Sequence, residues 1–153
     1  MSVKDRLAEL GLTLPPPSTP AANYVPYVVA GDLVHIAGQV PFFGGELRYV
    51  GKVGRDYTIE EAQEAAQLVG LNILAQLGAA LDGDFSRVIR CVRLGGFVNC
   101  VDDFTMQPAV VNGCSDLMVA VFGDSGRHAR AAVGCNGLPL GVCVEIEGTF
   151  LIR

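Results

Sequence analysis

A few charged and polar side chains have the types and spacing that acid–base chemistry on a small carboxylate would need. Glu145 and Glu147 lie two residues apart in an alternating segment, so both point to one face of a predicted strand. Arg130 begins a short apolar segment, and its planar guanidinium suits a carboxylate bound through two parallel hydrogen bonds. Tyr27 falls in a strand-like segment and Asn112 in a helix-like one. Taken singly, these residues are more typical of solvated carboxylates, a surface arginine, a half-buried aromatic and an exposed amide.

Familiar catalytic motifs are missing from the chain. It has no GxxxxGK[ST] phosphate loop, no GxGxxG after a strand and no GxSxG turn. The two histidines, His35 and His128, are isolated, and therefore no metal site is predicted. Asp124 and Ser125 lie just before His128 and suggest parts of a catalytic triad, but a polar loop after a helix is the favoured interpretation.

Composition and charge exclude several classes of protein. The 153 residues fit one domain, and with half of them hydrophobic the chain can bury a core without disulfides. A net charge of −5 repels phosphate backbones, so no nucleic-acid partner is expected. The five cysteines are odd in number and form no Cys-x-x-Cys pair, which favours reduced thiols in the cytoplasm. With neither a signal-peptide core nor an apolar run long enough to span a bilayer, no membrane partner is expected.

Segments rich in β-branched and aromatic residues are predicted to form strands. They are residues 24–30, 33–37, 47–50, 87–98, 130–134 and 142–152. Gly31 and Asp32 separate the first two segments, which predicts a hairpin. The last segment alternates strictly, with Val, Ile and Phe residues on one face and Glu145 and Glu147 on the other.

Two longer helices are predicted between these strands. Thr58 and Glu61 have the spacing of a capping box, and apolar residues then recur every three or four positions as far as residue 80. The second helix spans residues 108–122, because Pro108 suits its first turn and Gly123 can end it. Residues 1–20 are expected to form an arm, in which a short helix at residues 5–10 precedes an extended proline-rich segment.

This order of elements predicts an α+β domain over residues 21–153. Two helices are too few to cover both faces of the sheet, so they are expected on one face of a mixed sheet, in two layers. The other sheet face carries small and polar residues together with some apolar ones. Burial against identical subunits would cover that face.

Along nearly its whole length after the proline-rich arm, the chain resembles the RidA/YjgF family, also called L-PSP endoribonuclease-like proteins, and specifically a divergent branch of it. The segments that carry the resemblance are NYVPYVVAGDLVHIAGQVP, the alanine-rich helix, GFVNCVDDF, the VVNG helix start, HARAAVG and LPLGVCVEIEGTF. The resemblance implies a chorismate-mutase-like fold and a homotrimer with clefts between subunits. It also implies hydrolysis of reactive 2-imino or 2-enamino acids to 2-keto acids and ammonia, with no cofactor.

The family's functional residues match particular positions of this chain. Arg130 matches the arginine that grips the substrate carboxylate, and Glu145 matches the glutamate that positions and activates water. Tyr27 and Asn112 match the tyrosine and asparagine that line the same cleft. Gly38 matches a backbone contact near the substrate.

Two positions depart from the family pattern and leave alternatives open. Where the family often has Arg-Ser-Cys, this chain has Arg130-Ala131-Ala132, and the serine that precedes the glycine of SGQ is Ala37 here. The polar lining is therefore thinner, and a non-catalytic module that binds small carboxylates in the same clefts is the main alternative to the deaminase. Ribonuclease activity or inhibition of translation, which the older family name suggests, is disfavoured by the acidic charge.

Overall fold

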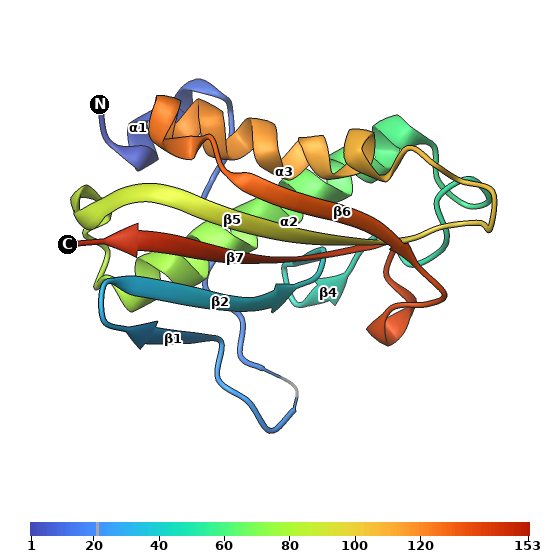
Figure 1. Ribbon diagram of the computed structural model, residues 1–153, viewed down its shortest axis with the longest axis horizontal. Coiled ribbons are helices and arrows are strands. Elements are labelled where there is room, and N and C mark those ends of the chain that lie inside the picture. Colours follow the sequence, from blue (N-terminus) through green and yellow to red (C-terminus); the bar gives the residue numbers. More distant parts are fainter. Residues whose placement is uncertain (21) are drawn as a thin grey trace.

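The centre of the fold is a five-stranded mixed sheet (Figure 1). In the computed structural model, which describes residues 1–20 and 22–153, its strands are β1 (Tyr27–Ala30), β2 (Leu33–Gln39), β5 (Val88–Asn99), β6 (Ala129–Cys135) and β7 (Val144–Ile152). They lie in the order β1-β2-β7-β5-β6, with β5 and β6 parallel and the other neighbours antiparallel. A parallel pair needs a crossover connection, and α3 (Gln107–Phe122) provides it.

Helices α2 (Ile59–Ala80) and α3 pack together on one face of this sheet, and in the described part of the chain the other face carries no helix (Figure 1). Strand β7 alternates accordingly, since every second residue from Val144 to Ile152 is buried and the intervening ones are half-buried. Phe150 packs against Phe122 at the end of α3, with 6.2 Å between the ring centroids. The predicted two-layer α+β fold is therefore confirmed. None of the described helices is both long enough and apolar enough to cross a membrane.

Both long helices follow the signals in the sequence. The Thr58 hydroxyl accepts a hydrogen bond from the Glu61 amide at 3.2 Å, and the Glu61 carboxylate accepts one from the Thr58 amide at 2.8 Å. Helix α3 begins one residue before Pro108 and ends at Gly123, whose φ of 62° stops the helix. The predicted hairpin is also present, with Ala30 paired to Leu33 across the turn.

Several predicted strands differ in extent from the structure. Strand β1 begins at Tyr27 rather than at residue 24, and β7 begins at Val144 rather than at residue 142. The strand expected at residues 47–50 is replaced by β4 (Glu46–Leu47), which pairs with β3 (Phe42–Phe43) in a separate small sheet. Tyr49 has a φ of 56°, which a continuing strand does not allow.

The N-terminal arm is attached to the helical layer. Helix α1 (Val3–Glu9) begins two residues earlier than predicted, because Ser2 forms a capping box with Asp5, and it buries Val3 and Leu7 in the core. Further along, Gln76 of α2 donates a hydrogen bond to the carbonyl oxygen of Ser18 at 2.8 Å. The predicted boundary between arm and domain falls at residue 21, which lies outside the described residues.

We expect Thr58→Ala to lower the free energy of unfolding by about 1 kcal/mol, because the first turn of α2 loses its side-chain acceptor. Denaturant unfolding followed by circular dichroism measures the change. Thr13→Ala, at an exposed threonine of the arm, is the matched control. A midpoint for Thr58→Ala equal to that of the wild type would contradict the capping role.

Candidate active site

Arg130 lies in β6 against a stripe of hydrogen-bond acceptors on α3. Pro108, Asn112 and Ser115 are spaced at i, i+4 and i+7, so they share one face of that helix. The Nη1 group of Arg130 donates to Asn112 Oδ1 at 2.9 Å and to Ser115 Oγ at 3.0 Å, and its Nη2 group donates to the Pro108 carbonyl oxygen at 3.3 Å. The structure thus brings together two residues of the predicted site, Arg130 and Asn112.

The guanidinium of Arg130, a half-buried residue, keeps free donors for a ligand. Of its five N–H groups, three are used by α3, and the Nε–H and one Nη2–H have no partner among the described residues. The three acceptors are all neutral. Within residues 1–20 and 22–153, no carboxylate lies within salt-bridge distance of Arg130. A guanidinium in this state is suited to binding a carboxylate side-on, through two adjacent donors.

Ser115 and His128 form a contact that reasoning from the sequence missed. Ser115 Oγ lies 2.9 Å from His128 Nε2, while His128 Nδ1 lies 2.6 Å from the Gly126 carbonyl oxygen. Asp124, in contrast, lies in η2 (Gly123–Gly126) and pairs with exposed Arg127 at 3.5 Å, so the polar-loop interpretation of that segment holds. The signal that would have revealed Ser115 is its spacing of three residues from Asn112, which places the two polar side chains on one face of a mostly apolar helix.

Glu145 lies on β7, on the sheet face away from the helices, next to the irregular end of β2. The register between β2 and β7 shifts between Ile36 and Gln39, and Gly38 comes so close to Glu145 that a Cβ on Gly38 would collide with the carboxylate. Burial raises the pKa of Glu145, and the nearby charge of Glu147 raises it further. A carboxylate tuned in this way is suited to exchanging protons nearer neutral pH.

A cavity of about 910 Å³ opens beside Glu145, between the end of β2, residues 18–20 and 22–26, and η3 (Pro139–Gly141). Most of its lining is apolar, and among the described residues that line it Glu145 is the only charged one. Ala37 and Gly38 form part of its wall. An apolar cavity with one functional group of raised pKa fits a small organic ligand.

Within one protomer, these two groups of residues stay apart. Arg130 and Asn112 meet on the face that the helices cover, whereas Glu145 and Gly38 meet on the opposite face. Tyr27 joins neither group, since it packs against the core from β1. The role assigned to Tyr27 therefore stays a prediction.

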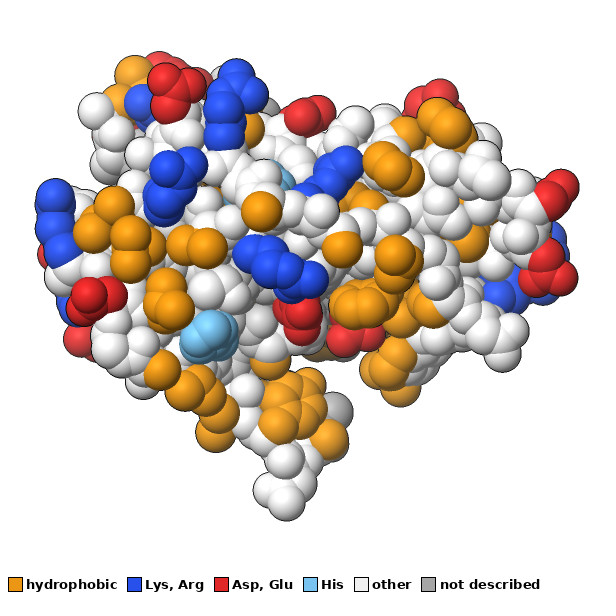
Figure 2. Space-filling view, viewed as in Figure 1, with side chains coloured by type: hydrophobic (Ala, Val, Ile, Leu, Met, Phe, Trp, Pro, Cys, Tyr) orange, Lys and Arg blue, Asp and Glu red, His pale blue; other side chains and the backbone are white. Residues whose placement is uncertain are grey.

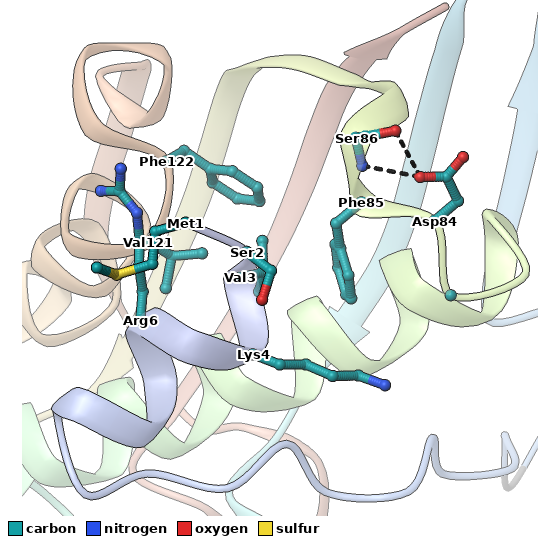
Figure 3. A pocket seen from close by; sticks show the side chains of 11 residues that line it. Met1, Ser2, Val3, Lys4, Arg6, Asp84, Phe85, Ser86, Val121 and Phe122 are labelled. Carbon is teal, nitrogen blue, oxygen red and sulfur yellow. Dashed lines mark hydrogen bonds between the residues drawn. The ribbon is translucent and has the colours of Figure 1, made fainter.

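A second cavity, of about 450 Å³, lies at the far end of the molecule between α1, η1 (Phe85–Arg87) and the end of α3 (Figure 3). Its one carboxylate, Asp84, already accepts hydrogen bonds from the amide and hydroxyl of Ser86. Arg6 donates to the Ala120 carbonyl oxygen of α3 at 3.3 Å. Asp84 thus caps η1, and Arg6 links α1 to α3. We assign this cavity no chemistry.

Comparison with known proteins identifies the family. A family profile described as "YjgF/chorismate_mutase-like, putative endoribonuclease" matches residues 4–146. The chain belongs to the YjgF/chorismate-mutase-like family. It is 45% identical to Protein TCP17 of Trypanosoma cruzi over 148 residues, which cover 95% of this chain and 91% of that protein.

Solved structures resemble the chain to different degrees. The protein Atu1372 of Agrobacterium tumefaciens, described as of unknown function, is 46% identical and superposes with a TM-score of 0.93, covering 99% of this chain and 92% of that one. RidA from the Antarctic bacterium Psychrobacter sp. is 27% identical, with a TM-score of 0.60 over 92% of this chain and 96% of that one. The resemblance to the RidA/YjgF family is confirmed, and the difference in TM-score agrees with a divergent branch.

The two departures from the YjgF family pattern lie at both groups of site residues. Ala132 is half-buried and packs against the core from β6, two residues after Arg130. Ala37 lines the cavity beside Glu145. Each site group therefore keeps its charged residue and loses one polar neighbour.

Proposed function

We propose that this protein hydrolyses reactive 2-imino or 2-enamino acids to 2-keto acids and ammonia. Water adds to the electrophilic imine carbon while Glu145 takes one of its protons. Glu145 returns that proton to nitrogen, which gives a carbinolamine. Glu145 then carries the remaining hydroxyl proton to the amine, the carbon–nitrogen bond breaks, and ammonia leaves as the carbonyl forms. Arg130 holds the substrate carboxylate and so orients the imine carbon toward the water. The reaction needs no cofactor.

The observation that carries this proposal is the state of Arg130. Arg130 is half-buried, its three protein partners are neutral, and the described residues supply it with no carboxylate. A cation partly withdrawn from water without a counter-ion carries a cost that a ligand carboxylate would offset. A substrate with a carboxylate next to the reacting carbon would supply the missing charge.

We propose that the active site lies between subunits of a homotrimer. Arg130 and Glu145 lie on opposite faces of one sheet, so the Arg130 group of one copy would meet the Glu145 group of another. The open sheet face is suited to such an assembly, since Phe97 and Val133 lie in register with Glu145 and are 37% and 48% exposed. Figure 2 shows hydrophobic side chains gathered over the strands on this face. Burying that patch against identical subunits would stabilise the assembly.

We expect light scattering to give the mass of a trimer at micromolar concentration. A monomer would contradict both the assembly and the shared site.

A sharper measurement uses two inactive variants, Arg130→Ala and Glu145→Gln. The two are mixed, partially unfolded and refolded together. Some mixed trimers then contain a cleft with both residues intact, so part of the wild-type rate should return. No recovery would indicate that both residues must come from one copy.

A non-catalytic carboxylate-binding module is the second candidate, because Ala132 and Ala37 replace polar residues of the family pattern. A turnover assay separates the two functions. With 2-aminoacrylate generated in situ, a deaminase accelerates the release of pyruvate and ammonia, whereas a binding module holds pyruvate without changing the rate.

The family description also mentions an endoribonuclease, but the net charge of −5 disfavours that activity here. Retention on heparin at low salt would support it.

A further inference from the structure

A continuous chain of hydrogen bonds runs from Arg130 to the backbone before β6. Arg130 Nη1 donates to Ser115 Oγ at 3.0 Å, Ser115 Oγ lies 2.9 Å from His128 Nε2, and His128 Nδ1 lies 2.6 Å from the Gly126 carbonyl oxygen. A carbonyl only accepts, so His128 Nδ1 must carry the proton. In the neutral ring Nε2 is then the acceptor, and Ser115 donates to it.

The environment of His128 favours this neutral ring. Burial lowers the pKa of His128, and the positive charge of Arg130 lowers it further, against the opposing effect of the Gly126 carbonyl. Ser115 therefore donates its hydroxyl proton to His128 Nε2. A lone pair of the same oxygen remains to accept the hydrogen bond from Arg130. Without His128, the hydroxyl would be free to turn and donate to a carbonyl of the preceding helical turn.

We infer that Ser115 and His128 are positioning residues, which fix the Arg130 guanidinium so that its Nε–H and its free Nη2–H face the ligand as a side-on fork. The inference rests on the carboxylate-binding role proposed for Arg130. Asn112 and Pro108 hold the same guanidinium from the other positions of the α3 stripe. Of its three partners, Ser115 alone is oriented by a further side chain from the part of the chain that the structure describes.

A serine beside a histidine also fits a nucleophile and its base, but the position of Ser115 argues against that role. Ser115 lies in the middle of α3 (Gln107–Phe122), where backbone N–H groups are engaged in the helix. No pair of free amides is therefore available nearby to stabilise a developing oxyanion. The same Oγ already accepts a hydrogen bond from Arg130.

The test compares binding of pyruvate with that of methyl pyruvate, in which the carboxylate is masked, by calorimetry on the assembled protein. Ser115→Ala and His128→Phe should weaken pyruvate binding about tenfold, as expected for one misplaced charge-assisted hydrogen bond. Binding of methyl pyruvate should not change. In turnover the same variants should raise KM and leave kcat nearly unchanged, because the lost interaction is made equally with substrate and transition state.

Conservative variants distinguish a loss of positioning from poor folding of Ser115→Ala or His128→Phe. Ser115→Thr retains the hydroxyl and His128→Gln retains an acceptor for it, so both should recover most of the pyruvate affinity. Wild-type affinity in Ser115→Ala and His128→Phe, with binding lost in Arg130→Ala, would overturn the positioning role and leave the clamp intact. Equal losses for pyruvate and its ester would also overturn it, as would covalent labelling of Ser115 by a fluorophosphonate. Wild-type binding in Arg130→Ala would instead remove the proposed function itself.

Discussion

Replacing Arg130 with alanine should weaken the binding of pyruvate or 2-ketobutyrate on the order of a hundredfold or more, because charge-assisted hydrogen bonds contribute roughly 1.5–3 kcal/mol each. The substrate carboxylate would lose both members of the fork and its counter-charge together. Neither Asn112 nor Ser115 can replace that charge, since both are neutral. Calorimetry on the wild type and on Arg130→Ala measures the loss.

Arg130→Lys refines this expectation. An ammonium retains the charge but cannot present two parallel donors, so binding should fall between the values for the wild type and for the alanine variant. Arg127→Ala is the matched control, since Arg127 lies three residues away and is 71% exposed. Its affinity for pyruvate should equal that of the wild type. If Arg130→Ala binds pyruvate as tightly as the wild type does, the carboxylate clamp is wrong.

Glu145→Gln should have the opposite pattern, with binding of keto acids preserved and deaminase turnover removed. The amide keeps the shape of the side chain and can hydrogen-bond water, but it cannot accept a proton from it. Glu147→Gln is the control, because Glu147 lies on the same face and is paired with Arg93 at 3.2 Å. That variant should retain most of the turnover. Full activity in Glu145→Gln would exclude Glu145 as the acid–base group.

The dependence of the reaction rate on pH should follow the ionisation of the Glu145 carboxylate. Burial raises the pKa of Glu145 above its usual value of 4.5, and only the ionised form can take a proton from water. The rate at low substrate concentration should therefore fall on acidification through that raised pKa, at a higher pH than an exposed glutamate would give. Glu147→Gln should move this acidic limb to lower pH, since the Glu147 charge contributes to the shift.

Local patterns predicted most of the fold. The alternation of β7, the capping box at Thr58 and the Gly123 stop each depend on residues close together in sequence, and the structure has all three. Tyr49 was not foreseen, because no local rule indicates a positive φ at a tyrosine. Gly38 lies against the Glu145 carboxylate, more than a hundred residues later in the chain, and no local pattern predicts that contact.

The site was predictable only in part, for the same reason. Arg130 and Glu145 were identified through family resemblance, and the spacing of these residues alone favoured ordinary surface roles. The contact between Ser115 and His128 arises because the β5–α3–β6 crossover lays the middle of a helix beside the start of a strand. Sequence spacing does not reveal which helical face meets that strand. The cavity beside Glu145 combines segments from four parts of the chain, and no single one of them indicates it.

Deaminase activity is tested most directly by the initial rate of ammonia release from 2-aminoacrylate generated in situ, with the wild type and Arg130→Ala at equal concentrations. We expect the wild type to accelerate release well above the spontaneous rate, and Arg130→Ala to return it close to that rate. A wild-type rate equal to the spontaneous one, in a protein that still binds pyruvate, would contradict the deaminase and leave a carboxylate-binding module.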